Sequence, residues 1–80
     1  MIDTQSLGKK IAEARRSTGM TQSALALRVG VTAQAVSKWE QGRSCPDIAI
    51  LDEIADALGI SLIELLGMDE RGQLREKQSS

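Results

Sequence analysis

The side chains in this sequence that are best suited to recognition chemistry are Gln34, Ser37 and Lys38, which follow one another at helical spacing. A glutamine amide can make two hydrogen bonds to adenine N6 and N7, and a lysine can donate to guanine O6 and N7. A serine hydroxyl can bond to several bases, and the methyl group of Ala33 can contact that of thymine. This set predicts contacts with base edges in double-stranded DNA, although a phosphate contact alone stays open for Lys38.

Residues at the beginnings of two expected helices have the chemistry of phosphate contacts. Thr21 and Gln22 stand where the first of these helices begins, so free backbone N–H groups and the helix dipole favour an anion there. Thr32 takes the same place before the second helix. Both threonines are expected first of all to cap their helices, and the same hydroxyls can also bind a phosphate.

These candidates need two helices held at a fixed angle, and the pattern predicts them at residues 22–29 and 33–41. Only three residues separate the two segments, which suits helices that cross at a wide angle rather than a long antiparallel hairpin. Gly30 supplies the positive φ that such a turn requires. Val36 and Trp39 are expected to point inward, so we expect Trp39 in the core rather than stacked on a base.

Three further helices are expected at residues 5–18, 47–58 and 62–66, and no segment alternates with the period of a strand. The chain is therefore predicted to be all-α, with one domain at 1–67 and a flexible polar tail at 68–80. The side chains expected in the core are apolar and share one face of each helix: Leu7, Ile11, Ala14, Leu25, Ala26, Val29, Val36, Trp39, Ile50, Leu51, Ile54, Ala55, Leu58, Leu62, Leu65 and Leu66. The expected N-caps are Asp3 or Thr4, Thr21, Thr32 and Ser61, the last in a capping box with Glu64.

Charge is divided unevenly along the chain. The net charge is −1, but residues 1–45 carry seven basic and three acidic side chains, whereas residues 46–80 carry three basic and eight acidic ones. The first half is therefore at +4 and the second at −5, so a polyanion is expected to meet the first half.

Other classes of function have little support in the residues. There is no histidine, tyrosine or glycine-rich phosphate loop, and the single cysteine, Cys45, excludes an internal disulfide. Asp52 and Asp56 stand four residues apart, but an acidic solvated helix face explains them better than a metal site. We therefore expect no enzyme, cofactor, metal or small-molecule ligand. With no signal or membrane-spanning pattern, we expect a cytoplasmic protein that joins the nucleoid when bound to DNA.

Over about residues 7–67, the chain resembles the Cro/phage-repressor (XRE-like) type of helix-turn-helix transcription regulator. The residues that carry this resemblance lie at turn and core positions: Thr21, Gln22, Leu25, Ala26, Val29, Gly30, Val31, Val36, Ser37, Lys38, Trp39, Glu40, Gly42, Arg43, Pro46, Ala55, Leu58, Gly59, Ile60, Ser61, Leu65 and Leu66. The resemblance implies a compact five-helix bundle of the lambda-repressor-like type. Its second and third helices would form the helix-turn-helix, with the third helix in the major groove.

The resemblance also assigns roles to four polar residues. It implies that Gln22 and Arg43 hold the DNA backbone. It further implies that Arg15, late in the first helix, pairs with Glu40 at the end of the third. A partly buried pair there would orient the reading helix, whereas two solvated charges would contribute about 0–1 kcal/mol.

We therefore expect a sequence-specific transcriptional regulator of prokaryotic or phage type, a repressor that binds a palindromic operator as a homodimer. Dimer contacts are assigned to Ile63, Met68 or Leu74, which are apolar but not needed in the core. The competing interpretation is a protein-interaction or antitoxin-type module that uses the same fold. Steep salt dependence of binding would favour DNA over that alternative.

Overall fold

Each helix in the structure begins where a side chain can bind its free backbone N–H groups. In the computed structural model, which describes residues 3–67, a side-chain oxygen precedes every helix and accepts a hydrogen bond from an N–H two or three residues later. The helices are α1 (Thr4–Ser17), α2 (Gln22–Val29), α3 (Ala33–Glu40), α4 (Ile48–Leu58) and α5 (Leu62–Leu65). Their caps, in the same order, are Asp3, Thr21, Thr32, Asp47 and Ser61.

The all-α prediction is confirmed, since the part of the chain that the structure describes contains these helices and no strand. Helix bounds agree with the expected ones to within one residue. The choice between Asp3 and Thr4 as the first cap resolves to Asp3. α4 begins later than expected because the Asp47 carboxylate caps it, accepting a hydrogen bond from the backbone N–H of Ile50 at 2.9 Å. The tail expected at 68–80 lies outside the described residues.

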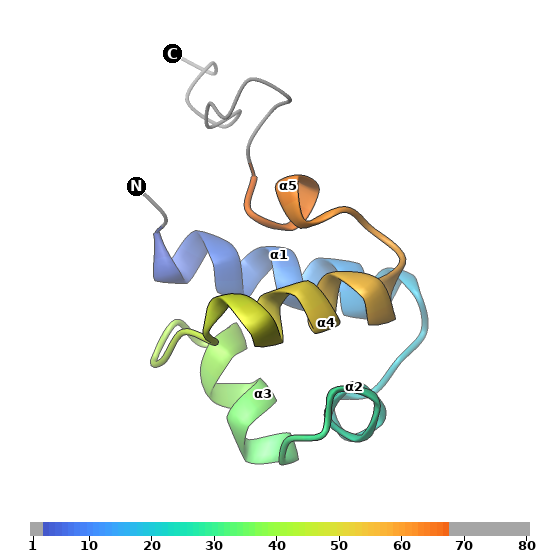
Figure 1. The fold of residues 1–80 in the computed structure, drawn as a ribbon. Helices are drawn as coiled ribbons and strands as arrows, with labels where there is room; N and C mark the ends of the chain where they lie inside the picture. Colours follow the sequence, from blue (N-terminus) through green and yellow to red (C-terminus); the bar gives the residue numbers. More distant parts are fainter. Residues whose placement is uncertain (1–2, 68–80) are drawn as a thin grey trace.

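The core is built from aliphatic side chains of all five helices, together with the indole of Trp39. α1 packs against α3, α2 packs against both α3 and α4, and α5 packs against α4 and α1. Figure 1 shows the result, with α2 and α3 at one end of the molecule and α5 at the other. The buried apolar side chains are Leu7, Ile11, Ala12, Leu25, Ala26, Val29, Val36, Trp39, Leu51, Ile54, Ala55, Leu58 and Leu65.

Four residues expected in the core are only partly buried, because they stand at its margin. These are Ala14, Ile50, Leu62 and Leu66, which pack against the outside of the buried cluster. Ala12 is buried without having been expected there. Each of these differences concerns the edge of an amphipathic stripe, where helical periodicity alone does not determine burial.

The turn between α2 and α3 depends on a glycine in the left-handed conformation. Gly30 has a φ of +86°, which a residue with a Cβ rarely adopts. The backbone N–H groups of Gly30 and Val31 both donate to the carbonyl of Ala26, at 2.8 and 2.9 Å. Thr32 then returns to an extended conformation and caps α3. The joint between the two helices is thus fixed by backbone hydrogen bonds.

The crossing of α1 over the end of α3 depends on a second glycine, Gly8, which is buried inside α1. A Cβ at this position would overlap the carbonyl oxygen of Trp39 and would lie 2.9 Å from that of Glu40. Because backbone atoms cannot move aside as a flexible side chain can, only glycine permits this distance between the two helices. α1 is therefore seated directly on the last turn of α3.

Candidate nucleic-acid interface

The outward face of α3 presents the four residues expected to contact bases. Gln34 and Lys38 are exposed, and Ala33 and Ser37 are half-buried at the edge of the same face. On the opposite side of the helix, Val36 is fully buried and Trp39 is 7% exposed. The burial of Trp39 removes its indole from any position where a base could stack on it.

The two threonines at the helix beginnings act as caps. Thr21 Oγ1 accepts a hydrogen bond from the N–H of Ala24 at 3.0 Å, and Thr32 Oγ1 accepts one from the N–H of Ala35 at 3.1 Å. Both threonines are exposed. A capping hydroxyl uses only a lone pair for this bond and keeps its own proton, so each threonine can still donate to a phosphate oxygen.

Behind this face, Arg15 of α1 and Glu40 of α3 form a two-pronged ion pair. Arg15 Nε lies 2.6 Å from Glu40 Oε2, and Arg15 Nη2 lies 3.1 Å from Glu40 Oε1. The remaining terminal nitrogen of the guanidinium donates to the carbonyl of Met20, just before α2, at 2.8 Å. The side chains are 11% and 6% exposed, respectively. One arginine therefore joins the end of α3 to α1 and to the segment that leads into α2.

This environment keeps both members of the pair charged. Burial raises the pKa of Glu40, but the hydrogen bonds from Arg15 and Gln22 and the nearby positive charges outweigh burial, so its pKa is lower than usual. The hydrogen bond to Glu40 raises the pKa of Arg15 despite burial. Each partner thus stabilises the ionised form of the other at neutral pH.

Gln22 takes part in the same buried network, a contact that the sequence did not indicate. Its Nε2 donates to Glu40 Oε1 at 2.9 Å. The resemblance assigned Gln22 to the DNA backbone alone, and the structure adds this hydrogen bond to Glu40 at the end of α3. Because an amide nitrogen carries two hydrogens, the second remains able to meet a phosphate.

A second hydrogen-bond chain lies on the exposed side of α3 and includes Gln41, a residue absent from the predicted site. Gln41 Nε2 donates to Ser37 Oγ at 2.9 Å, and its Oε1 accepts from Arg43 Nη1 at 3.3 Å. The sequence carried a signal for this residue, because Gln41 falls two helical turns after Gln34 on the same face. The chain connects a predicted base contact, Ser37, with a predicted phosphate contact, Arg43.

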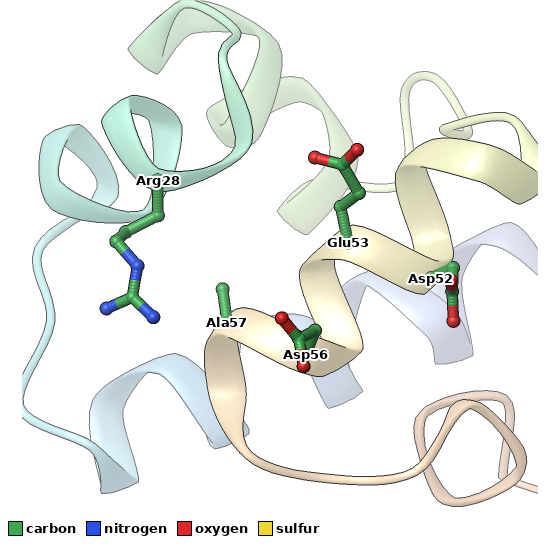
Figure 2. A pocket seen from close by; sticks show the side chains of 5 residues that line it. All are labelled: Arg28, Asp52, Glu53, Asp56 and Ala57. Carbon is green, nitrogen blue, oxygen red and sulfur yellow. The ribbon is translucent and has the colours of Figure 1, made fainter.

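The surface between α2 and α4 is acidic. Figure 2 shows a pocket there that is lined by Arg28 of α2 and by Asp52, Glu53 and Asp56 of α4. Three carboxylates against one guanidinium make this pocket negative, so it would repel a polyanion. No group of three or more histidine, cysteine, aspartate or glutamate side chains within residues 3–67 is arranged to hold a metal ion.

Comparison with known proteins finds matches to helix-turn-helix proteins in both sequence and structure. A helix-turn-helix family model matches residues 11–65, which is more than half of the chain. An uncharacterized HTH-type transcriptional regulator of Methanothermobacter thermautotrophicus is 44% identical over 63 residues, covering 78% of this chain and 91% of that protein. Multiprotein-bridging factor 1 of Eremothecium gossypii is 39% identical over 57 residues, covering 71% of this chain but only 38% of its own length.

Among solved structures, the P22 c2 repressor in complex with a synthetic operator aligns with a TM-score of 0.74. The two sequences are 33% identical, and the alignment covers 79% of this chain and 96% of the repressor chain. None of the helices described here is both long and apolar enough to cross a membrane.

Proposed function

Because the chain belongs to the helix-turn-helix family of DNA-binding transcriptional regulators, we propose that it represses transcription by occupying an operator with α3 in the major groove. The observation that carries this proposal is the division of α3 into two sides. Val36 and Trp39 anchor one side in the core, and Gln34 and Lys38 stand exposed on the other. A helix held in this way can enter a groove without exposing its apolar face.

Within this proposal, Gln34 makes paired hydrogen bonds to adenine, and Lys38 donates to guanine or to a phosphate. Ser37 adds one hydrogen bond, and Ala33 packs against a thymine methyl group. Each good paired contact is worth about 1–3 kcal/mol of discrimination between bases. These residues carry the sequence preference.

Phosphate contacts hold the helix in register. Gln22 donates its second amide hydrogen, Thr21 and Thr32 donate their hydroxyl protons, and Arg43 grips the backbone beyond the end of α3. Such contacts set position and orientation without distinguishing one base sequence from another.

Two copies bound to a palindromic operator complete the proposal, with half-sites about one helical turn apart. One predicted dimer contact, Ile63, lies within α5 and is 44% exposed. The other two, Met68 and Leu74, lie outside the described residues. The small size of the domain supports this proposal, because a single domain of this kind would cover only one half-site.

The decisive experiment is selection of bound sequences from random double-stranded DNA, followed by affinity measurements over a range of salt concentrations. The protein should enrich one palindromic motif, with affinity that falls steeply as salt rises. Gln34→Ala should relax the preference at one or two positions, whereas Gln22→Ala should weaken all sequences alike. Failure to enrich any motif at low salt would overturn the proposal.

A protein-interaction module is the second candidate. Two large apolar side chains support it, since Leu27 on α2 is 84% exposed and Ile48 at the start of α4 is 64% exposed. A relative whose name describes a bridging factor points in the same direction. A mainly apolar protein interface would respond little to salt, so the same titration separates the two candidates.

A further inference from the structure

We propose that Gln41 is a positioning residue that makes Ser37 a hydrogen-bond donor toward DNA and so sets the preference at one base position. The inference rests on the proposed function, because it takes the outward face of α3 to be the reading surface. Gln41 would act through Ser37 and would not itself need to touch a base.

The orientation of the Gln41 amide follows from the chemistry of its neighbours. A guanidinium can only donate hydrogen bonds, so the group that faces Arg43 must be the amide oxygen, Oε1. The nitrogen, Nε2, then faces Ser37 and donates to its Oγ at 2.9 Å. Arg43 therefore determines which end of the amide meets the serine.

This arrangement gives the Ser37 hydroxyl a direction. Its oxygen accepts the hydrogen bond from Gln41, so one lone pair is occupied and its proton is left to donate elsewhere. Within residues 3–67, Ser37 Oγ has no other hydrogen bond and does not donate back to the carbonyl of Ala33. The proton is therefore available to the outward side of α3.

A hydroxyl that donates selects among bases by what they offer in the major groove. Guanine presents O6 and N7, adenine presents N7 and thymine presents O4, all of which accept hydrogen bonds. Cytosine presents only the N4 amino group, which donates. Ser37 should therefore discriminate against cytosine at the position it faces.

The chain also joins a base contact to a backbone contact. Arg43 uses one of its five N–H groups on Gln41 and retains four for phosphate. A phosphate that fixes Arg43 would thus also fix the amide and, through it, the serine hydroxyl.

The test compares three substitutions at the selected operator, namely Ser37→Ala, Gln41→Met and Gln41→Glu. Methionine has a similar length but cannot donate to the serine, and a glutamate carboxylate can only accept from it. The operator position that loses its preference in Ser37→Ala identifies the base that faces Ser37. Relative affinities for the four bases at that position are then measured for every variant.

The wild-type protein should bind cytosine about fivefold more weakly than the best base, as expected for one hydrogen bond. Gln41→Met should remove most of this discrimination. The double variant with Ser37→Ala and Gln41→Met should have the same relative affinities for the four bases as Ser37→Ala alone. Gln41→Glu should reverse the preference toward cytosine, because the serine then donates to the carboxylate and turns a lone pair outward. The negative charge of the new glutamate should weaken binding to all sequences alike, so this general loss cancels when affinities for the four bases are compared as ratios within one variant.

An unchanged base preference in both Gln41 variants would overturn the inference, and so would additive effects of Ser37→Ala and Gln41→Met. A Ser37→Ala variant that alters no position would overturn it as well. Each of these results leaves the proposed function intact if the wild-type protein enriches a motif. Only a wild-type protein that enriches none would overturn both.

Discussion

Two neighbouring residues at the end of α3, Glu40 and Gln41, belong to hydrogen-bond networks of opposite kinds. The Glu40 carboxylate faces inward and meets Arg15 of α1 and Gln22 of α2. The Gln41 amide faces outward and, among residues 3–67, bonds to Ser37 of α3 and to Arg43 of the loop that follows it. The inner network connects separate helices, whereas the outer one links residues that are close in sequence.

The comparison distinguishes the residues that position α3 from the residues that are proposed to contact DNA. A buried charge that loses its partner is costly, so the inner network should control both stability and the orientation of α3. Exposed hydrogen bonds exchange readily with water, so the outer network should matter little to stability and mainly to binding preference. Three substitutions and one change of pH test this contrast.

The largest effect is expected for Glu40→Ala, which leaves the guanidinium of Arg15 buried without its partner. We expect a loss of about 3 kcal/mol in the free energy of unfolding, together with weaker binding to every DNA sequence. Urea unfolding and operator titration measure the two effects. Gln41→Ala is the matched control at the next residue and should change stability by less than about 0.5 kcal/mol. Equal losses in the two variants would remove the contrast.

Gly8→Ala tests whether the close packing of α1 against the last turn of α3 is needed for the inner network. Alanine favours a helix over glycine by about 1 kcal/mol, yet here its Cβ would meet the carbonyls of Trp39 and Glu40. We expect a net destabilisation of about 1–3 kcal/mol, as for other overpacked sites. Thermal unfolding measures it, with Lys9→Ala as the exposed neighbouring control. A stabilised variant would show that the two helices can separate at no cost.

Gln22→Ala should have a smaller effect on folding, because Glu40 keeps both of its bonds to Arg15. Loss of one hydrogen bond to a buried carboxylate should cost about 1 kcal/mol in the free energy of unfolding. Ser23→Ala, at an exposed position next to it, provides the control. A Gln22 variant as stable as this control would mean that the bond to Glu40 contributes nothing to the folded state.

The smallest effect is expected from acid. The pKa of Glu40 is lower in the folded protein than its ordinary value of 4.5, so the stability that the pair contributes is complete above that value. It is lost as the pH falls below 4.5 and through the folded-state pKa. Glu40→Gln has no carboxylate to take up a proton, so the stability gap between this variant and the wild-type protein should narrow toward acid pH. A gap that stays constant between neutral pH and pH 3 would contradict the ionised pair.

Much of the fold could be predicted because its signals are local. Caps such as Thr21 and Thr32 and the turn residue Gly30 define where α2 and α3 begin and meet. Gly8 shows the limit of such signals. In the sequence it is simply a glycine within a helix, and its necessity depends on carbonyl groups more than thirty residues away.

The candidate site likewise contains residues that local sequence signals predict and contacts that they do not. Gln34 and Lys38 follow from the helical repeat around Val36, and their exposure agrees with it. The contacts of Gln22 and Gln41 could not be predicted with equal ease, because an amide can donate and accept in several directions. Which neighbour it meets depends on the tertiary arrangement for Gln22 and on the rotamer for Gln41.

The two-sided construction of α3 has a consequence for how such a protein can change over evolutionary time. Gln34, Lys38 and Gln41 are exposed, Ser37 is half-buried, and none of them belongs to the buried core. Under the proposed function, substitutions at these positions would change the base preference with little effect on the stability of the fold. A duplicated copy of this chain could acquire a new target while keeping the same scaffold, and designed variants can use the same freedom.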